Sequence, residues 1–306
     1  MRIAVIGAGG VGGYFGGRLA AADNEVTFVA RGAQLDAIRA NGIEILSALG
    51  NLRIHPVRAV ELIDEVGVVD LVLIAVKLWD TENVAQTLRP LRDKGAAILS
   101  LQNGVDKDEV IRKCVPEDSI LGGVCYIASK LSKPGVISHT GTVQRMVFGE
   151  YSGERSKRAE TLLDACRRAA IDAEITDSIE RVIWEKFVFL VGLSGTTATI
   201  RQTIGPIRAN PQSRAFLVDV MKEVVALGRA LGVDLREDFA EDMLAFCDSL
   251  PPSMTSSMYH DLESGSRLEL PWLSGGVAEL GRRVGIPTPL NRAIYDILAL
   301  YSSGKA

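Results

Sequence analysis

The chain has 306 residues, enough for about two domains, and its 47% hydrophobic and 24% charged residues are typical of a globular protein. Its formal net charge of −4 and the lack of basic clusters argue against nucleic acid as the main ligand. The mean hydropathy is +0.17, yet apolar runs such as 68–76 are much shorter than the roughly 18 residues of a membrane-spanning helix. Since the first residues lack a signal-peptide pattern, we expect a cytoplasmic protein that does not enter membranes.

The first half of the chain alternates between strand-like and helix-like segments. Short apolar or β-branched runs predict strands at 2–6, 25–30, 68–76, 96–101, 120–128 and 136–149, and a hairpin over 43–46 and 52–57. Amphipathic stretches predict helices at 12–22, 33–41 and 81–91. This alternation predicts a doubly wound sheet of the Rossmann type.

The second half of the chain predicts helices only. They span 179–200, 213–231, 238–250, 273–284 and 290–301. The predicted fold class is therefore α/β, with an N-terminal Rossmann-type doubly wound sheet and an all-helical C-terminal domain. We place a dinucleotide-binding domain at 1–175 and a helical substrate and catalytic domain at 176–306.

A glycine-rich segment follows the first strand and opens the first helix. It matches the GxGxxG pattern of dinucleotide-binding loops, and we expect its residues Gly7, Ala8, Gly9, Gly10, Val11 and Gly12 to bind a cofactor. The first glycine permits the tight turn, the second lets a pyrophosphate approach the backbone, and the third lets the helix pack close to the strand. A glycine turn without a ligand is the alternative.

The end of the second strand indicates which dinucleotide is bound. A NAD site usually has an acidic residue there, about 20 residues beyond the glycines, for the ribose 2′-hydroxyl. Residues 28–32 contain no acidic side chain, and Arg31 is present. Because a 2′-phosphate suits an arginine and is repelled by a carboxylate, we expect NADP (NADPH) as the cofactor.

Two further candidates follow later strands, where ligands bind in open parallel sheets. Lys77 ends the run 68–76, and Asn103 lies in Gln102-Asn103-Gly104 after the strand 96–101. Each also has an ordinary explanation, as an exit from the core or as a turn former. The four cysteines and three histidines are scattered, so we expect no metal site and only reduced structural thiols.

The helical half contains a candidate catalytic pair. Lys186 lies in an otherwise apolar helix, where partial desolvation would lower its pKa and suit it to proton transfer. A lysine whose ammonium group reaches water is the alternative. Glu269 lies between two leucines and needs a partner, for which Lys186 is a candidate.

In combination these segments resemble the ketopantoate reductase (2-dehydropantoate 2-reductase) family over nearly the whole chain. The resemblance is carried by the glycine loop, Val76-Lys77, Gln102-Asn103-Gly104, Trp184-x-Lys186 and Ser256-Ser257-Met258-x-x-Asp261 followed by Glu269. It implies an NADPH-dependent reduction of ketopantoate to (R)-pantoate in pantothenate biosynthesis, with the active site in a cleft between a Rossmann domain and a helical domain.

The resemblance also implies a role for each residue. Lys186 would be the general acid, and Glu269 would hold it and contact the cofactor. Asn103 would touch cofactor and substrate, and Ser257 would bind substrate. Lys77 and Ala128 would contact the cofactor.

The match departs from the family at two substrate-binding positions. The family typically places asparagines four and eight residues after the catalytic lysine, where this chain has Leu190 and Ser194. Since a leucine cannot form a hydrogen bond, a more apolar 2-oxo acid is an alternative substrate. A related hydroxyacid or opine-type dehydrogenase and a non-catalytic NADP-sensing protein are further alternatives. The apolar helical half is compatible with a homodimer.

Overall fold

The computed structural model describes residues 1–305, which form two compact units, one of Met1–Ile179 and a second that begins at Glu180. The first unit is built on a single sheet of ten strands, nine of which run in the order β4-β3-β9-β8-β7-β6-β1-β2-β5, while β10 pairs with β9. The strands are β1 Arg2–Ile6, β2 Glu25–Val29, β3 Ile43–Ser47, β4 Leu52–Ile54, β5 Arg58–Val60, β6 Leu71–Ile74, β7 Ala97–Ser100, β8 Ile120–Lys133, β9 Val136–Gly149 and β10 Asp172–Ile175.

The strands from β5 to β8 in this order are all parallel, so their carboxyl ends lie along one edge of the sheet. Beyond them β9 runs antiparallel to β8, and β3 and β4 continue the sheet. In open sheets of parallel strands, ligands bind just outside the edge that the carboxyl ends of the strands form.

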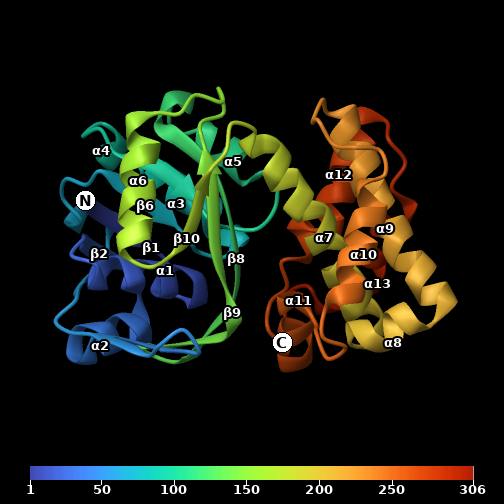
Figure 1. Ribbon diagram of the computed structural model, residues 1–306, viewed down its shortest axis with the longest axis horizontal. Coiled ribbons are helices and arrows are strands. Elements are labelled where there is room, and N and C mark those ends of the chain that lie inside the picture. Colours follow the sequence, from blue (N-terminus) through green and yellow to red (C-terminus); the bar gives the residue numbers. More distant parts are fainter. Residues whose placement is uncertain (306) are drawn as a thin grey trace. The chain divides into compact units, whose positions relative to one another are not determined.

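Helices cover both faces of the sheet (Figure 1). Side chains alternate along a strand, so Ile3 and Val5 of β1 pack with one set of helices and Ala4 and Ile6 with another. The first set is α1 Gly10–Ala21, α2 Gly32–Asn41 and α6 Lys157–Arg168, and the second is α3 Thr81–Thr87, α4 Arg89–Arg92 and α5 Lys107–Arg112. The predicted doubly wound α/β fold is confirmed.

Four of the buried residues of helix α1 are glycines, which lets the helix lie close to the sheet. A Cβ atom added at Gly16 would lie 2.6 Å from the ring of Phe28, and one at Gly17 would lie 2.8 Å from Ile45. Much of the glycine content of the N-terminal segment therefore serves helix–sheet packing.

The structure differs from the sequence prediction in some details. The predicted helix 81–91 is broken into α3 and α4, because Pro90 has no backbone N–H and its ring clashes with the preceding turn. The segments β5, α5, α6, β10, α8 and α11 were not predicted as elements. Most are short, and short segments show little periodicity.

The second unit contains only helices within the residues that the structure describes. They are α7 Ile179–Ile200, α8 Ile204–Ala209, α9 Pro211–Ala230, α10 Phe239–Ser249, α11 Ser257–Ser264, α12 Ser274–Val284 and α13 Pro289–Leu298, with short 3-10 turns η4 Leu270–Trp272 and η5 Ala299–Tyr301. The first unit has similar turns, η1 Ile63–Glu65, η2 Leu78–Asp80 and η3 Glu117–Ser119. The all-helical C-terminal region is confirmed.

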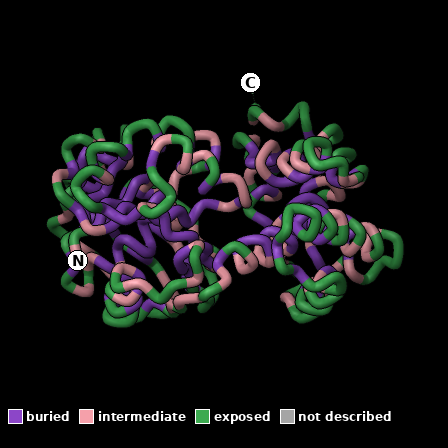
Figure 2. The backbone as a smooth tube through the Cα atoms, turned by 90° about the horizontal axis from the view of Figure 1, so that it is seen from above, coloured by how far each residue is buried: buried purple, intermediate pink, exposed green. Residues whose placement is uncertain are grey.

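The core of the second unit forms where α7 packs on α9. A Cβ atom at Gly228 would lie 2.9 Å from the buried Trp184 ring, and one at Gly192 would lie 2.5 Å from Met221. Figure 2 shows buried segments running through the interior of each unit. Over residues 1–305, no helix combines the length and apolar character needed to cross a bilayer.

Candidate functional site

The glycine loop after β1 has the geometry of a dinucleotide-binding turn. Gly7 has a φ of +96°, and its N–H donates to the carbonyl of Val29 at 3.1 Å. A Cβ atom there would lie 2.8 Å from the backbone nitrogen of Val76, so both conformation and space require glycine. At Gly12 a Cβ atom would lie 2.1 Å from the Gly7 carbonyl oxygen, which explains the close packing of α1.

Gly9 is different, because the protein's own packing does not require it. A Cβ atom added there would meet no described atom within 4 Å. Gly9 is the N-cap of α1, whose first turn has no acidic side chain. The first N–H groups of a helix and the positive end of its dipole favour an anion at this end. Bare backbone, open space and positive potential together fit the pyrophosphate of a dinucleotide.

One residue that supports this loop was not indicated by any pattern in the sequence. Gln34 of α2 donates through Nε2 to the Ala8 carbonyl at 2.6 Å, and its Oε1 accepts from the Gly135 N–H at 2.8 Å. Gln34 therefore ties the glycine loop to the turn between β8 and β9. Its partners are 26 and 101 residues away in sequence, so no local pattern indicates this role.

Arg31 follows β2 and forms an ion pair that the sequence did not suggest. Its Nη2 donates to Asp80 Oδ2 at 3.0 Å. Asp80 is the last residue of η2, the turn after β6. Residues 28–32 contain no acidic side chain, but the fold brings Asp80 to Arg31 from the turn that follows β6.

The segments after β6 and β7 are linked by the buried side chain of Gln102. Its Nε2 donates to the Lys77 carbonyl at 3.4 Å and to Thr81 Oγ1 at 2.8 Å, and its Oε1 accepts from the Ser100 hydroxyl at 3.0 Å. These bonds hold Lys77 beside the turn that contains Asn103. The Lys77 side chain is exposed, with Nζ 5.7 Å from the centre of the Trp79 ring, and Asn103 is half-buried.

Ala128 lies on the exposed surface of β8, at an irregularity in its pairing with β9 between Ile127 and Ser129. The same part of β8 touches the start of α1, because a Cβ atom at Gly10 would lie 2.5 Å from the Ser129 carbonyl oxygen. Ala128 is therefore close to the glycine loop.

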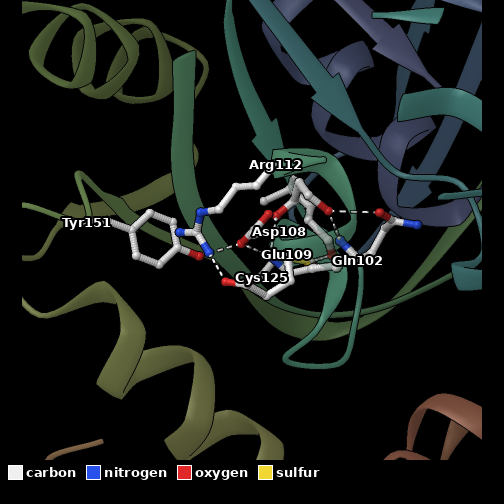
Figure 3. Close-up of polar contacts among 9 residues, drawn as sticks. Gln102, Asp108, Glu109, Arg112, Cys125 and Tyr151 are labelled. Carbon is white, nitrogen blue, oxygen red and sulfur yellow. Dashed lines mark hydrogen bonds and ion pairs between the residues drawn. The ribbon is translucent and has the colours of Figure 1, made fainter. Parts of the chain in front are cut away.

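A cluster of buried polar side chains begins shortly after the turn that contains Asn103. Lys107 Nζ donates to Asp108 Oδ2 at 2.8 Å and to the carbonyl of Ser100 at 3.3 Å, and the side chains of Lys107 and Asp108 are only 1% and 3% exposed. The Tyr151 hydroxyl donates to the same Asp108 oxygen at 2.7 Å. Figure 3 shows this hydroxyl pointing at Asp108, with Arg112 reaching over Tyr151.

The cluster is poorly solvated, and its ionisation reflects this. Burial, together with the negative charge of Asp108, raises the pKa of Tyr151 and keeps it a neutral donor. Burial also raises the pKa of Asp106. Because Lys107 is bonded to the last residue of β7, we infer that the cluster fixes the start of the Asn103 turn.

In the second unit, one face of α7 carries the residues that the sequence singled out. Lys186, Leu190 and Ser194 follow each other at intervals of four, so they lie along one side of the helix. Lys186 and Leu190 are half-buried, and Ser194 is fully buried. Within residues 1–305 the Ser194 hydroxyl has no hydrogen-bond partner. Trp184, two residues before Lys186, lies on the opposite side of the helix and is buried.

The same face of α7 contacts the start of α11. Thr197 lies eleven residues, about three turns, after Lys186. Its hydroxyl lies 3.0 Å from that of Ser256, the N-cap of α11, which in turn accepts from the Tyr259 N–H. The exposed Ser257 is the first residue of that helix. Glu269 is buried at the start of η4, where its carbonyl accepts from Trp272 and Leu273.

Comparison with known proteins decides what these features belong to. The model "Ketopantoate reductase PanE/ApbA" matches residues 3–153, and the model "Ketopantoate reductase PanE/ApbA C terminal" matches residues 178–302. The chain belongs to the ketopantoate reductase family. It is thus an oxidoreductase of the kind that acts on CH–OH groups, from a family of NAD(P)-dependent reductases.

Relatives of this ketopantoate reductase family member match it from end to end. It is 33% identical to "Uncharacterized oxidoreductase YkpB" of Bacillus subtilis, covering 100% of both chains. The crystal structure of 2-dehydropantoate 2-reductase from Geobacter metallireducens is similar with a TM-score of 0.90, 31% identity and coverage of 98% and 99%. A D-mandelate dehydrogenase structure with NADH and anilino(oxo)acetate shares the fold, with a TM-score of 0.89, 20% identity and coverage of 99% and 98%.

Proposed function

We propose that this family member reduces a small 2-oxo acid to the 2-hydroxy acid with NADPH, and that its substrate is 2-dehydropantoate, which yields (R)-pantoate for pantothenate and coenzyme A biosynthesis. The observation that carries the proposal is the α7 face with Lys186, joined through Thr197 and Ser256 to the helix that begins at Ser257. Full-length similarity to a 2-dehydropantoate 2-reductase supports it.

Residues 7–12 would hold NADPH, which would supply the hydride that the carbonyl carbon of the substrate accepts. Negative charge then develops on the carbonyl oxygen, and the ammonium of Lys186 stabilises this charge and donates the proton. Glu269 orients Lys186. Asn103 contacts cofactor and substrate, and Ser257 binds substrate at the start of α11.

The proposed cofactor site lies in residues 1–175, and residues 176–306 form the proposed substrate and catalytic domain. Residues 7–12 bind the pyrophosphate, and Arg31 binds the 2′-phosphate. Lys77, which follows β6, and Ala128, which lies within β8, contact the cofactor. The open space at Gly9 supports the site, and Arg31 without an acid at the end of β2 supports NADPH.

Steady-state kinetics test the proposal. NADPH oxidation is followed with 2-dehydropantoate beside a panel of 2-oxo acids with increasingly apolar side chains. We expect the highest kcat/KM with 2-dehydropantoate. Binding of NADPH without turnover of any 2-oxo acid would instead support the NADP-sensing alternative.

Leu190 favours a second candidate substrate, a more apolar 2-oxo acid. Leu190 lies one turn after Lys186 and offers no side-chain hydrogen bond, while Ser194 has a buried hydroxyl with no hydrogen-bond partner among residues 1–305. Leu190→Asn restores a polar side chain, and a buried polar contact is worth about 1–3 kcal/mol. If the apolar acid is the substrate, this variant should lose kcat/KM for it by about tenfold or more and gain activity with 2-dehydropantoate.

We also propose a cytoplasmic homodimer. Apolar side chains near the end of the chain support an interface, since Ile297, Leu300 and Tyr301 are 58%, 92% and 46% exposed. Light scattering of the purified protein tests the assembly, and a monomeric mass at micromolar concentration would contradict it.

A further inference from the structure

The ion pair between Arg31 and Asp80 lies beside the start of the glycine loop. Arg31 follows β2, and Asp80 ends η2 after β6. Strand β1 pairs with both β2 and β6 and so lies between them. The bond from Arg31 Nη2 to Asp80 Oδ2, 3.0 Å long, therefore crosses the carboxyl end of β1, where the loop begins.

The two side chains of this ion pair differ in how far they are exposed to solvent. The Arg31 side chain is 79% exposed, whereas that of Asp80 is 21% exposed. The backbone N–H of Asp80 donates to the Lys77 carbonyl at 2.9 Å, and the following residue begins α3. Since exposed ion pairs are weak, the guanidinium can leave at little cost, while the carboxylate stays near the loop.

We propose that Asp80 is a cofactor-specificity residue, whose carboxylate weakens the preference for a 2′-phosphorylated dinucleotide that Arg31 would otherwise give. The inference rests on the proposed use of a nicotinamide dinucleotide. A 2′-phosphate carries a charge of roughly −1.5 to −2 at neutral pH. To bind Arg31 it must displace Asp80 or lie within a few ångströms of a like charge. A ribose 2′-hydroxyl can instead donate a hydrogen bond to that carboxylate.

Asp80→Asn tests this with binding as the readout. The dissociation constants of NADPH and NADH are measured on the full chain by nicotinamide fluorescence, without substrate. We expect Asp80→Asn to tighten NADPH binding by at least about threefold, with NADH binding unchanged or weaker. The gain should shrink in about 0.5 M salt, because the repulsion is screened.

Two further variants act as controls. Asp80→Glu keeps the charge and should keep the NADPH-to-NADH ratio of the parent. Asp70→Asn removes a similar partner, since Asp70 accepts from Arg2 just before the same strand β6, but at its opposite end. It should leave both dissociation constants unchanged.

The outcomes are distinct. An unchanged or reduced NADPH preference in Asp80→Asn overturns the inference and makes Asp80 a support that orients Arg31 for phosphate. An equal gain in Asp70→Asn or Asp80→Glu also overturns it. If the parent protein binds neither dinucleotide, the proposed function itself fails. If the parent reduces 2-oxo acids while Asp80→Asn leaves the ratio unchanged, only the inference fails.

Discussion

Thr197 and Ser256 join α7 to the start of α11 through a hydrogen bond of 3.0 Å between their hydroxyl groups. Thr197 also donates to the Leu193 carbonyl at 2.6 Å, so the proton shared with Ser256 comes from Ser256. Both hydroxyls are buried, and the bond fixes how α11 meets the Lys186 face of α7. The position of Ser257 relative to that face is therefore a property of the second unit alone.

Replacing Lys186 tests its role in catalysis. We expect Lys186→Ala to lower kcat by about 10²- to 10⁴-fold, because the proton donor is lost, and to leave NADPH binding within about twofold of the parent. Steady-state kinetics and nicotinamide fluorescence measure the two effects. Lys222→Ala is the matched control, since Lys222 is an exposed lysine paired with Glu241 at 2.9 Å. Equal activity of the two variants would remove Lys186 from the reaction.

Two glycines of the loop should respond in opposite ways to the same substitution. Gly9→Ala should fold with nearly the parent's Tm, since the added methyl group meets open space, but should weaken dinucleotide binding by about tenfold or more. Gly12→Ala should lower the free energy of unfolding by at least about 1–3 kcal/mol, because its methyl group would collide with the Gly7 carbonyl. Thermal melts and NADPH titrations separate the two. Tight NADPH binding by Gly9→Ala would argue against a pyrophosphate at this position.

Breaking the buried ion pair should cost stability. Asp108→Asn leaves the ammonium of Lys107 buried without its counter-charge, which typically costs about 3–5 kcal/mol. Tyr151→Phe removes only one hydrogen bond to Asp108 and should cost about 1–2 kcal/mol. Urea unfolding measures both, and a smaller loss in Asp108→Asn than in Tyr151→Phe would contradict the assignment.

The carboxylate of Glu150 should make stability depend on acid pH. Burial alone would raise its pKa, but hydrogen bonds from Arg158 and Ser156 outweigh burial and hold the pKa below the ordinary 4.5. A lowered native pKa adds stability that is complete above pH 4.5 and is lost as the pH falls through the native value. Glu150→Gln should therefore be less stable than the parent by about 1–2 kcal/mol at pH 7, and the difference should shrink between pH 5 and about 2. A difference that stays constant over this range would show that the carboxylate charge is not involved.

Some features of this protein follow from the sequence alone, because they depend on neighbours within a few residues. The turn at Gly7, the end of α2 at Gly42 and the end of α12 at Gly285 are local, and all three glycines have a positive φ. The long apolar helix α7 was predicted with its observed bounds, since 22 residues give a clear helical pattern. These patterns were enough to predict the α/β fold class and its helical C-terminal region.

Other features were decided by the tertiary structure. Asp80 reaches Arg31 across 49 residues of sequence, and Tyr151 reaches Asp108 across 43, because parallel strands bring the ends of distant segments together. The fold likewise brings the Gln34 side chain to the Ala8 carbonyl of the glycine loop, 26 residues away in sequence. A local pattern cannot report such contacts, since strand order sets them. The sequence alone thus determined where the glycine loop, Arg31 and Lys186 occur along the chain, and the fold decided which charges and hydrogen bonds surround them.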